Sequence, residues 1–164
     1  MWAHLVNGRP DGVQISFETI NAPLSKWPRQ IRKLRKKVFP PWFATDLLPA
    51  PFRYRGWIIV ARLRSETVGF ALCDSLEGAS GVYLEEVAVL PRFQNEGIGT
   101  RLVFECACLA RHQGFLTMWA TPLSDEEHKG IWLQKLGLIP SSDATQCSLD
   151  EIISRAESLG LHPL

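Results

Sequence analysis

Tyr83-Leu-Glu-Glu-Val-Ala-Val-Leu-Pro91-Arg-Phe-Gln94-Asn-Glu-Gly97-Ile-Gly99-Thr-Arg-Leu102 is the stretch that decides the fold. An apolar strand runs into a proline, then a short polar loop, then a paired-glycine turn that opens a helix. Glycine lets the backbone come close to a ligand, and the first N–H groups of a helix have no partner within it. The stretch therefore predicts an anion site, and a phosphate-bearing cofactor is its natural occupant.

Two familiar glycine loops do not fit this stretch. The ATP-binding loop ends in Gly-Lys-Ser/Thr, whereas Thr100 and Arg101 follow the last glycine here. The dinucleotide fingerprint G-x-G-x-x-G needs a third glycine where this chain has Leu102. A glycine turn that only starts a helix is a further alternative.

A third pattern does fit. Gln94-Asn-Glu-Gly97-Ile-Gly99 has the form Gln/Arg-x-x-Gly-x-Gly/Ala and follows an apolar strand that ends in Val89-Leu-Pro91. It resembles the acetyl-CoA signature of the GNAT superfamily of N-acetyltransferases. About forty residues on, Leu133-Gln-Lys-Leu-Gly137-Leu138 is similar to the family's usual Tyr-Glu-Lys-Leu-Gly-Phe.

The pattern of elements agrees with this resemblance. Apolar alternation and short apolar runs predict strands at 13–20, 57–63, 67–73, 82–89 and 116–120, with a further edge strand open within 138–147. Helical spacing predicts helices at 24–38, 98–113, 125–136 and 148–160, the last with a capping box at Ser148. Residues 13–137 follow the order of the family.

The resemblance implies one α+β domain over residues 1–164. Its central sheet would be mostly antiparallel, twisted and splayed at the central strand, with helices on its flanks. The helix at 148–160 would be an addition to the core at 13–137. We expect the first helix to carry a basic outer face made of Arg29, Arg32, Lys33, Arg35, Lys36 and Lys37.

The resemblance also implies where acetyl-CoA would bind. Its pyrophosphate would lie on the backbone N–H groups of residues 94–100, and its pantetheine arm would fill the splayed edge of the central strand. Glu96 would bring a repulsive carboxylate to this loop, which Arg92 or Arg101 could offset. The cofactor-binding residues are therefore expected to be Val87, Ala88, Val89, Gln94, Asn95, Glu96, Gly97, Ile98, Gly99 and Thr100.

The expected reaction is direct attack of an amine on the thioester. An alkyl amine is a cation at neutral pH and must lose a proton first, so a carboxylate base is useful, directly or through water. Glu85 and Glu86 both lie on the central strand, and we expect Glu85 to be the base, with Glu86 as the alternative. Alternation along a strand would place Tyr83, Glu85, Val87 and Val89 on one face and Leu84, Glu86 and Ala88 on the other.

One departure from the family concerns the leaving thiolate. The tyrosine that often protonates it is replaced by Leu133, and neither of the two tyrosines, Tyr54 and Tyr83, lies on that helix. Either another group or water supplies the proton, or the thiolate leaves unaided, or turnover is weak or lost. The alternative function is therefore a CoA-binding regulatory or interaction module without turnover.

The acceptor side is expected around the first helix and the segment after it. We name Trp27, Trp42, Tyr54 and Tyr83 as candidate substrate-binding residues, although core packing would also explain aromatic side chains in this region. The acceptor is expected to be a primary amine on a small molecule or a peptide. The basic helix at 29–37 is expected to be a solvated face, with an acidic protein or nucleic acid as open alternative partners.

Composition limits the remaining classes. The net charge of +1 predicts no global attraction to nucleic acid or to a membrane, and no apolar run approaches the length of a membrane span. The four cysteines form no C-x-x-C pair, so we expect reduced, mostly buried thiols and no metal site. We expect no signal peptide and a cytoplasmic location. A homodimer stays open.

Overall fold

The computed structural model describes residues 14–21, 26–41, 56–75, 78–120, 131–138 and 145–162. Within them, six strands form one sheet in the order β1-β2-β3-β4-β5-β6. Every neighbouring pair is antiparallel except β4 and β5, which run parallel. The strands are β1 Ile15–Asn21, β2 Gly56–Leu63, β3 Glu66–Asp74, β4 Gly81–Val89, β5 Thr117–Ala120 and β6 Thr145–Ser148. The predicted α+β class and mostly antiparallel sheet are confirmed.

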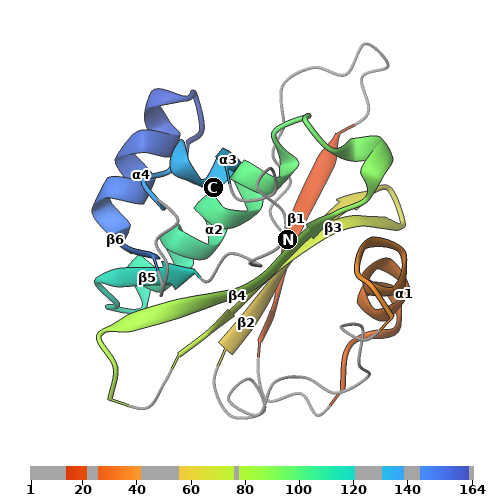
Figure 1. The fold of residues 1–164 in the computed structure, drawn as a ribbon, viewed down its shortest axis with the longest axis horizontal. Coiled ribbons are helices and arrows are strands. Elements are labelled where there is room, and N and C mark those ends of the chain that lie inside the picture. The colour runs from red at the N-terminus through yellow and green to blue at the C-terminus, as the bar shows by residue number, and fades with distance from the viewer. Residues whose placement is uncertain are drawn as a thin grey trace.

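The helices cover both faces of this sheet. Figure 1 shows α1 on one face and α2 with α4 on the other. α1 packs against β3 and β4, whereas α2 packs against β2, β3, β4 and α4. The helices are α1 Arg29–Val38, α2 Ile98–His112, α3 Ile131–Gln134 and α4 Leu149–Ser158, with a short 3₁₀ turn, η2, at Pro91–Phe93. None of the helices in the described ranges is long and apolar enough to cross a membrane.

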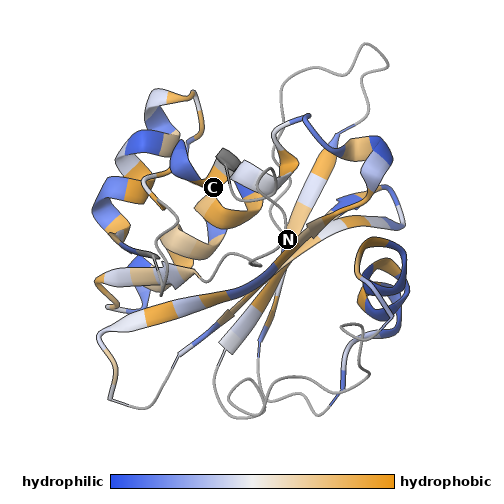
Figure 2. Ribbon diagram, in the orientation of Figure 1, coloured by the Kyte–Doolittle hydropathy of each residue, from blue (hydrophilic) through white to orange (hydrophobic). Residues whose placement is uncertain are grey.

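The core lies between the sheet and these helices. β3 is buried from Thr67 to Asp74, which matches a strand covered on both faces. Figure 2 shows the strands largely in orange and α1 largely in blue, so α1 contributes a narrow apolar stripe beneath a polar surface. Ile31 and Leu34 are the buried apolar residues of that stripe.

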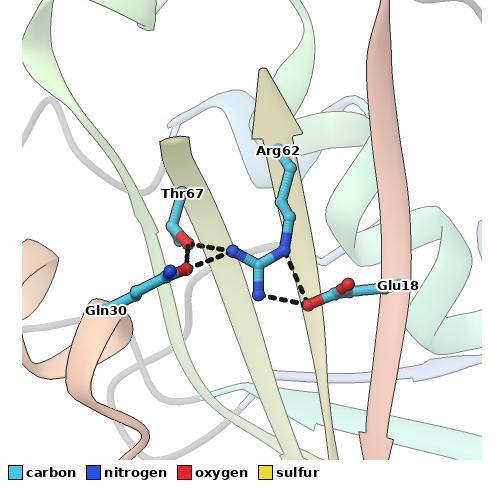
Figure 3. A network of polar contacts seen from close by, with 4 residues as sticks. All are labelled: Glu18, Gln30, Arg62 and Thr67. Atoms are coloured by element: carbon cyan, nitrogen blue, oxygen red, sulfur yellow. Dashed lines mark hydrogen bonds and ion pairs between the residues drawn. The ribbon is translucent and has the colours of Figure 1, made fainter. Parts of the chain in front are cut away.

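A polar network fixes one end of α1 to the sheet (Figure 3). Arg62 on β2 donates from Nε to Glu18 on β1 at 2.7 Å and from Nη1 to the Thr67 hydroxyl on β3 at 2.9 Å. Gln30 on α1 accepts from both Arg62 and Thr67. Three strands and the helix therefore share one set of hydrogen bonds, which satisfies the buried Thr67 hydroxyl and sets the position of α1.

The structure corrects the predicted basic face of the first helix. Arg35 is 3% exposed and points to the sheet instead of to solvent. The helix begins at Arg29, so Trp27 precedes it, with Pro28 at the N-cap. Arg35 follows Leu34 on the same stripe as Ile31, at helical spacing i and i+4, which places it on the buried side.

The predicted C-terminal elements are present with shorter bounds. α3 covers Ile131–Gln134, and the rest of the predicted helix before residue 131 lies outside the described residues. The open edge strand is β6. At the start of α4, the Ser148 hydroxyl accepts a hydrogen bond from the Glu151 N–H at 3.1 Å, as the capping motif predicts. The Glu151 carboxylate accepts a hydrogen bond from Arg155 Nε at 2.9 Å.

Candidate functional site

Among the described residues, β5 pairs with only the first part of β4, and the unpaired edge that follows is called the β4–β5 opening below. β5 pairs with β4 only from Gly81 to Leu84, through the partners Thr117 to Ala120. From Glu85 to Val89, β4 has no partner on that side among the described residues, although its other side stays paired with β3. A strand edge of this kind leaves a row of backbone N–H and C=O groups for a ligand to bond.

A β-bulge marks the start of the open edge. Leu72 pairs with Glu86, and the next residue of β3, Cys73, pairs with Leu84, so Glu85 is the extra residue. Bulges re-aim side chains and increase the local twist of a strand. The opening between β4 and β5 begins at this residue.

The bulge also corrects the predicted faces of β4. Directly paired residues share a face of the sheet, and Leu72 and Asp74 lie on the same face of β3. Their partners Glu86 and Tyr83 therefore also share a face, although strict alternation had placed them on opposite ones. This face is covered by α1, since Glu86 bonds to Arg35. Leu84 lies on the α2 face with its partner Cys73.

The loop after β4 leads directly into α2. Asn95 and Gly97 both have left-handed backbones, with φ of 63° and 81°. Gly97 is the N-cap of α2, and no side chain caps this end of the helix. The first bond back into the helix is from the Arg101 N–H to the Gly97 carbonyl at 2.9 Å. The N–H groups before Arg101 have no acceptor in the helix, which gives the predicted anion site its donors.

Gln94 shapes this loop through its side chain. Its Nε2 donates to the Val89 carbonyl at 2.9 Å, and its backbone N–H donates to the Pro91 carbonyl at 3.2 Å. The backbone N–H of Gln94 is therefore already bonded, which corrects the prediction that it is one of the donors of the anion site at residues 94–100. Glu96 is exposed. The two arginines that could offset its charge have other acidic partners. Arg92 forms an ion pair with Glu66, and the buried Arg101 forms one with Glu105.

Glu86 is tied to α1 by a buried ion pair. The Arg35 Nε and Nη2 atoms donate to the two Glu86 carboxylate oxygens, each at 2.8 Å. The side chains of Arg35 and Glu86 are 3% and 7% exposed. Burial raises the pKa of Glu86, and the guanidinium beside it opposes that shift. Arg35 also lies over the Trp27 ring, with 4.2 Å from Cζ to the ring centroid.

Glu85 and Asp74 form the other acidic group near the opening. Glu85 is exposed overall, but part of its side chain is shielded from water, and this shielding raises its pKa. Asp74, at the end of β3, is 3% exposed, and its Oδ1 has no hydrogen-bond partner. Burial, aided by the nearby Glu85 charge and opposed by a hydrogen bond from the Ser75 backbone, raises the pKa of Asp74 to about 6.

The predicted aromatic residues have different surroundings. Tyr83 is half-buried, and its ring centroid lies 5.8 Å from that of its β5 partner Trp119. Trp27 is 3% exposed and packs edge-on against Phe70, with 5.5 Å between centroids. A substrate would reach the Trp27 ring only if its neighbours moved. Trp42 and Tyr54 lie outside the described residues.

The sequence contained signals for two residues that the prediction of this site omitted. The spacing of Ile31, Leu34 and Arg35 places an arginine on a buried stripe, so a buried acidic partner was to be expected. Asp74 directly follows a long apolar strand, which is where a carboxylate can lie at the edge of a core.

A hollow of about 180 Å³ lies elsewhere, between α1 and the β2–β3 turn near Lys33 and Leu90. Its lining includes none of Asp74, Glu85 and Glu86.

The comparison with protein families can now be added to this geometry. The family described as Acetyltransferase (GNAT) family matches residues 26–137, about two thirds of the chain. The chain belongs to the GNAT family of acetyltransferases. The match spans the open strand β4, the signature loop and α3. No curated protein matches the sequence significantly.

Solved GNAT structures share this fold at low sequence identity. A GNAT-family protein from Desulfovibrio desulfuricans has a TM-score of 0.64 and 14% identity, over 82% of this chain and 99% of its own. The ribosomal-protein-S18-alanine N-acetyltransferase of Escherichia coli has 0.59 and 15%, over 81% and 94%. A Bacillus subtilis acetyltransferase solved in complex with CoA has 0.59 and 18%, over 76% of each chain. At these identities the likeness establishes the fold.

Proposed function

We propose that this GNAT protein moves an acetyl group from acetyl-CoA to a primary amine, by direct attack of the amine nitrogen on the thioester. The observation that carries the proposal is the presence of two sets of backbone groups that are available to a ligand. One is the open edge of β4 from Glu85 to Val89, and the other is the uncapped start of α2. A CoA complex of the Bacillus subtilis neighbour supports the choice of cofactor.

The residues present fit such a cofactor. The N–H groups of Asn95 to Thr100 would hold the diphosphate, and the helix dipole would add roughly 0.3–1 kcal/mol of charge stabilisation. The main chain of Val87 and Val89 would bond the pantetheine arm along the open edge. An N–H group that faces the open edge, at Val87 or Val89, would stabilise negative charge on the acetyl oxygen during attack, because the Ala88 N–H faces β3. Acetyl-CoA itself supplies the acetyl group in an activated form, as a thioester.

We assign the base to Glu85, because Glu86 is held by two bonds from Arg35. Glu85 would accept a proton from the incoming ammonium group, directly or through water, and so free the nitrogen lone pair. The nitrogen then bonds to the acetyl carbon as the carbon–sulfur bond breaks. The nitrogen loses its second proton, and the departing thiolate takes up one proton to become CoA thiol. One proton is released overall.

Leu133 motivates a second candidate function. It packs half-buried on α3 and carries no group that could protonate a thiolate. Water could supply that proton, since a thiolate is a good leaving group. If turnover is absent, the same backbone donors would still serve a CoA-binding regulatory or interaction module. The two candidates share a binding site and differ only in chemistry.

Calorimetry and a thiol-release assay test the proposal in sequence. Acetyl-CoA should bind the wild-type protein, and Gly99→Trp should abolish binding by placing a bulky side chain in the first turn of α2. Release of CoA thiol should then depend on added primary amines, and Glu85→Gln should reduce it about 10²–10⁴-fold. Binding without amine-dependent release would favour the second candidate. The absence of acetyl-CoA binding would refute both.

A further inference from the structure

We infer that Asp74, together with the ring of its pairing partner Tyr83 and the Trp119 ring that packs on Tyr83, binds the ammonium group of the acceptor at the paired end of the β4–β5 opening. This inference rests on the proposed function and adds a residue that selects the substrate. It assigns no proton transfer to Asp74. The base remains Glu85.

The position of Asp74 brings it to the acceptor side. It pairs across the sheet with Tyr83, and Tyr83 pairs in turn with Trp119 on β5. All three lie just before the bulge, where β5 is still hydrogen-bonded to β4. The cofactor would lie along the residues after the bulge. Asp74 is therefore beyond the thioester end of that edge, where an acceptor must enter.

The chemistry of Asp74 calls for a cationic donor. Asp74 is 3% exposed, yet its Oδ1 has no hydrogen-bond partner, and the Ser75 backbone donates a hydrogen bond to the carboxylate. A buried carboxylate oxygen without a donor is costly, so its persistence needs a reason. With its pKa raised to about 6, the group is ionised at neutral pH and above. An alkylammonium ion would supply the missing donor and the opposite charge, and it would reach Oδ1 once the side chains over Asp74 moved, because Asp74 is as buried as Trp27.

The groups around Asp74 leave this role open to a ligand. Arg35 reaches the same face of the sheet but directs two N–H groups at Glu86. Glu85 on β4 adds negative charge, and the nearby Cys73 thiol has its pKa raised well above the usual range by burial, so it stays neutral. Tyr83 and Trp119 offer aromatic faces, and aromatic faces attract ammonium ions. Charge and surface together fit a cation with an apolar body.

A titration that follows Asp74 itself tests the inference. Protein with isotope-labelled aspartate carboxyls, saturated with CoA, would be titrated with n-butylammonium chloride at about pH 8, where the amine is protonated and Asp74 is ionised. n-Butanol at constant ionic strength is the matched neutral probe. Assignment of the Asp74 carboxyl signal uses Asp74→Asn, or Asp74→Glu if the amide does not fold. The control variant is Asp150→Asn, on an exposed α4 carboxylate that pairs with Arg111.

The expected result is a shift of the Asp74 signal that saturates with n-butylammonium at up to about 100 mM. The apparent affinity for n-butanol should be at least ten-fold weaker. Asp74→Asn should weaken n-butylammonium binding at least ten-fold, as followed on the Tyr83 and Trp119 ring signals, whereas Asp150→Asn should not. An Asp74 signal that does not respond selectively, or ring signals that respond equally in Asp74→Asn, would overturn the inference. Failure of CoA to bind would instead count against the proposed function.

Discussion

Replacing Glu86 by glutamine should destabilise the protein without removing its chemistry. Glutamine keeps the shape of the side chain and one acceptor oxygen for Arg35, but it removes the charge that balances the guanidinium. Arg35 and Glu86 are 3% and 7% exposed and share two bonds of 2.8 Å. The substitution therefore removes the negative charge that Glu86 places against the buried Arg35 guanidinium.

The structure sets the size of this effect. An exposed ion pair contributes about 0–1 kcal/mol, whereas removal of one partner of a buried pair costs about 3–5 kcal/mol. Because a domain of this length loses roughly 2–4 °C of melting temperature per kcal/mol, the expected fall is about 6–20 °C. Replacing both residues, in Arg35→Met with Glu86→Leu, should cost less than the sum of the single changes by about 2 kcal/mol. Methionine can keep the packing on Trp27 that the Arg35 side chain provides.

Urea unfolding of the wild type, Glu86→Gln, Arg35→Met, Glu86→Leu and the double variant Arg35→Met with Glu86→Leu measures these terms. Below the melting temperature, acetyl transfer by Glu86→Gln should stay within about ten-fold of the wild type, whereas Glu85→Gln should lose more than that. A cost below about 1 kcal/mol for Glu86→Gln would show that the pair behaves as an exposed one. A larger kinetic loss for Glu86→Gln than for Glu85→Gln would reverse the assignment of the base.

Three further predictions follow from other parts of the structure. Gly81→Ala should destabilise the protein by about 1–3 kcal/mol in urea unfolding, because the added Cβ would lie 2.3 Å from the Thr117 hydroxyl and 2.8 Å from the Trp119 ring. Gly97→Ala, with φ of 81° and open space around the new Cβ, should cost only about 1–2 kcal/mol of backbone strain, and loss of acetyl-CoA binding beyond about ten-fold would show that the side chain itself meets the ligand. The raised pKa of Asp74 means that the native state holds its proton more tightly than the unfolded chain, so stability should fall as pH rises from 3.8 to about 6. Asp74→Asn should remove up to about 3 kcal/mol of that fall, and an unchanged pH dependence of unfolding would contradict the burial of this carboxylate.

Most elements of the fold could be predicted because their patterns are local. The mostly apolar run before Pro91 predicted β4 to within one residue, and the glycine pair predicted the start of α2. The Ser148 cap was readable for the same reason, since its partner Glu151 lies three residues away. These features depend on neighbours along the chain, which the sequence displays directly.

The candidate site was harder to predict because it depends on pairing across the sheet. The bulge at Glu85 follows from how β4 registers with β3, and nothing within Tyr83–Val89 alone indicates an extra residue. Strict alternation therefore placed Tyr83 on the wrong face. The partner of Glu86 lies 51 residues earlier, on a helix whose basic residues suggested a solvated face. Long-range ion pairs and register shifts are tertiary choices that local patterns do not encode.

The bulge explains how two adjacent glutamates come to have different surroundings. In a regular strand, Glu85 and Glu86 would simply alternate, and each would need its own partner on its own face. The extra residue instead leaves Glu86 in register with Leu72, under α1, where Arg35 neutralises it. Glu85 is left exposed at the point where β4 parts from β5. One carboxylate therefore holds a helix on the sheet, while the other is exposed at the opening, as a base that we propose to act there would need to be.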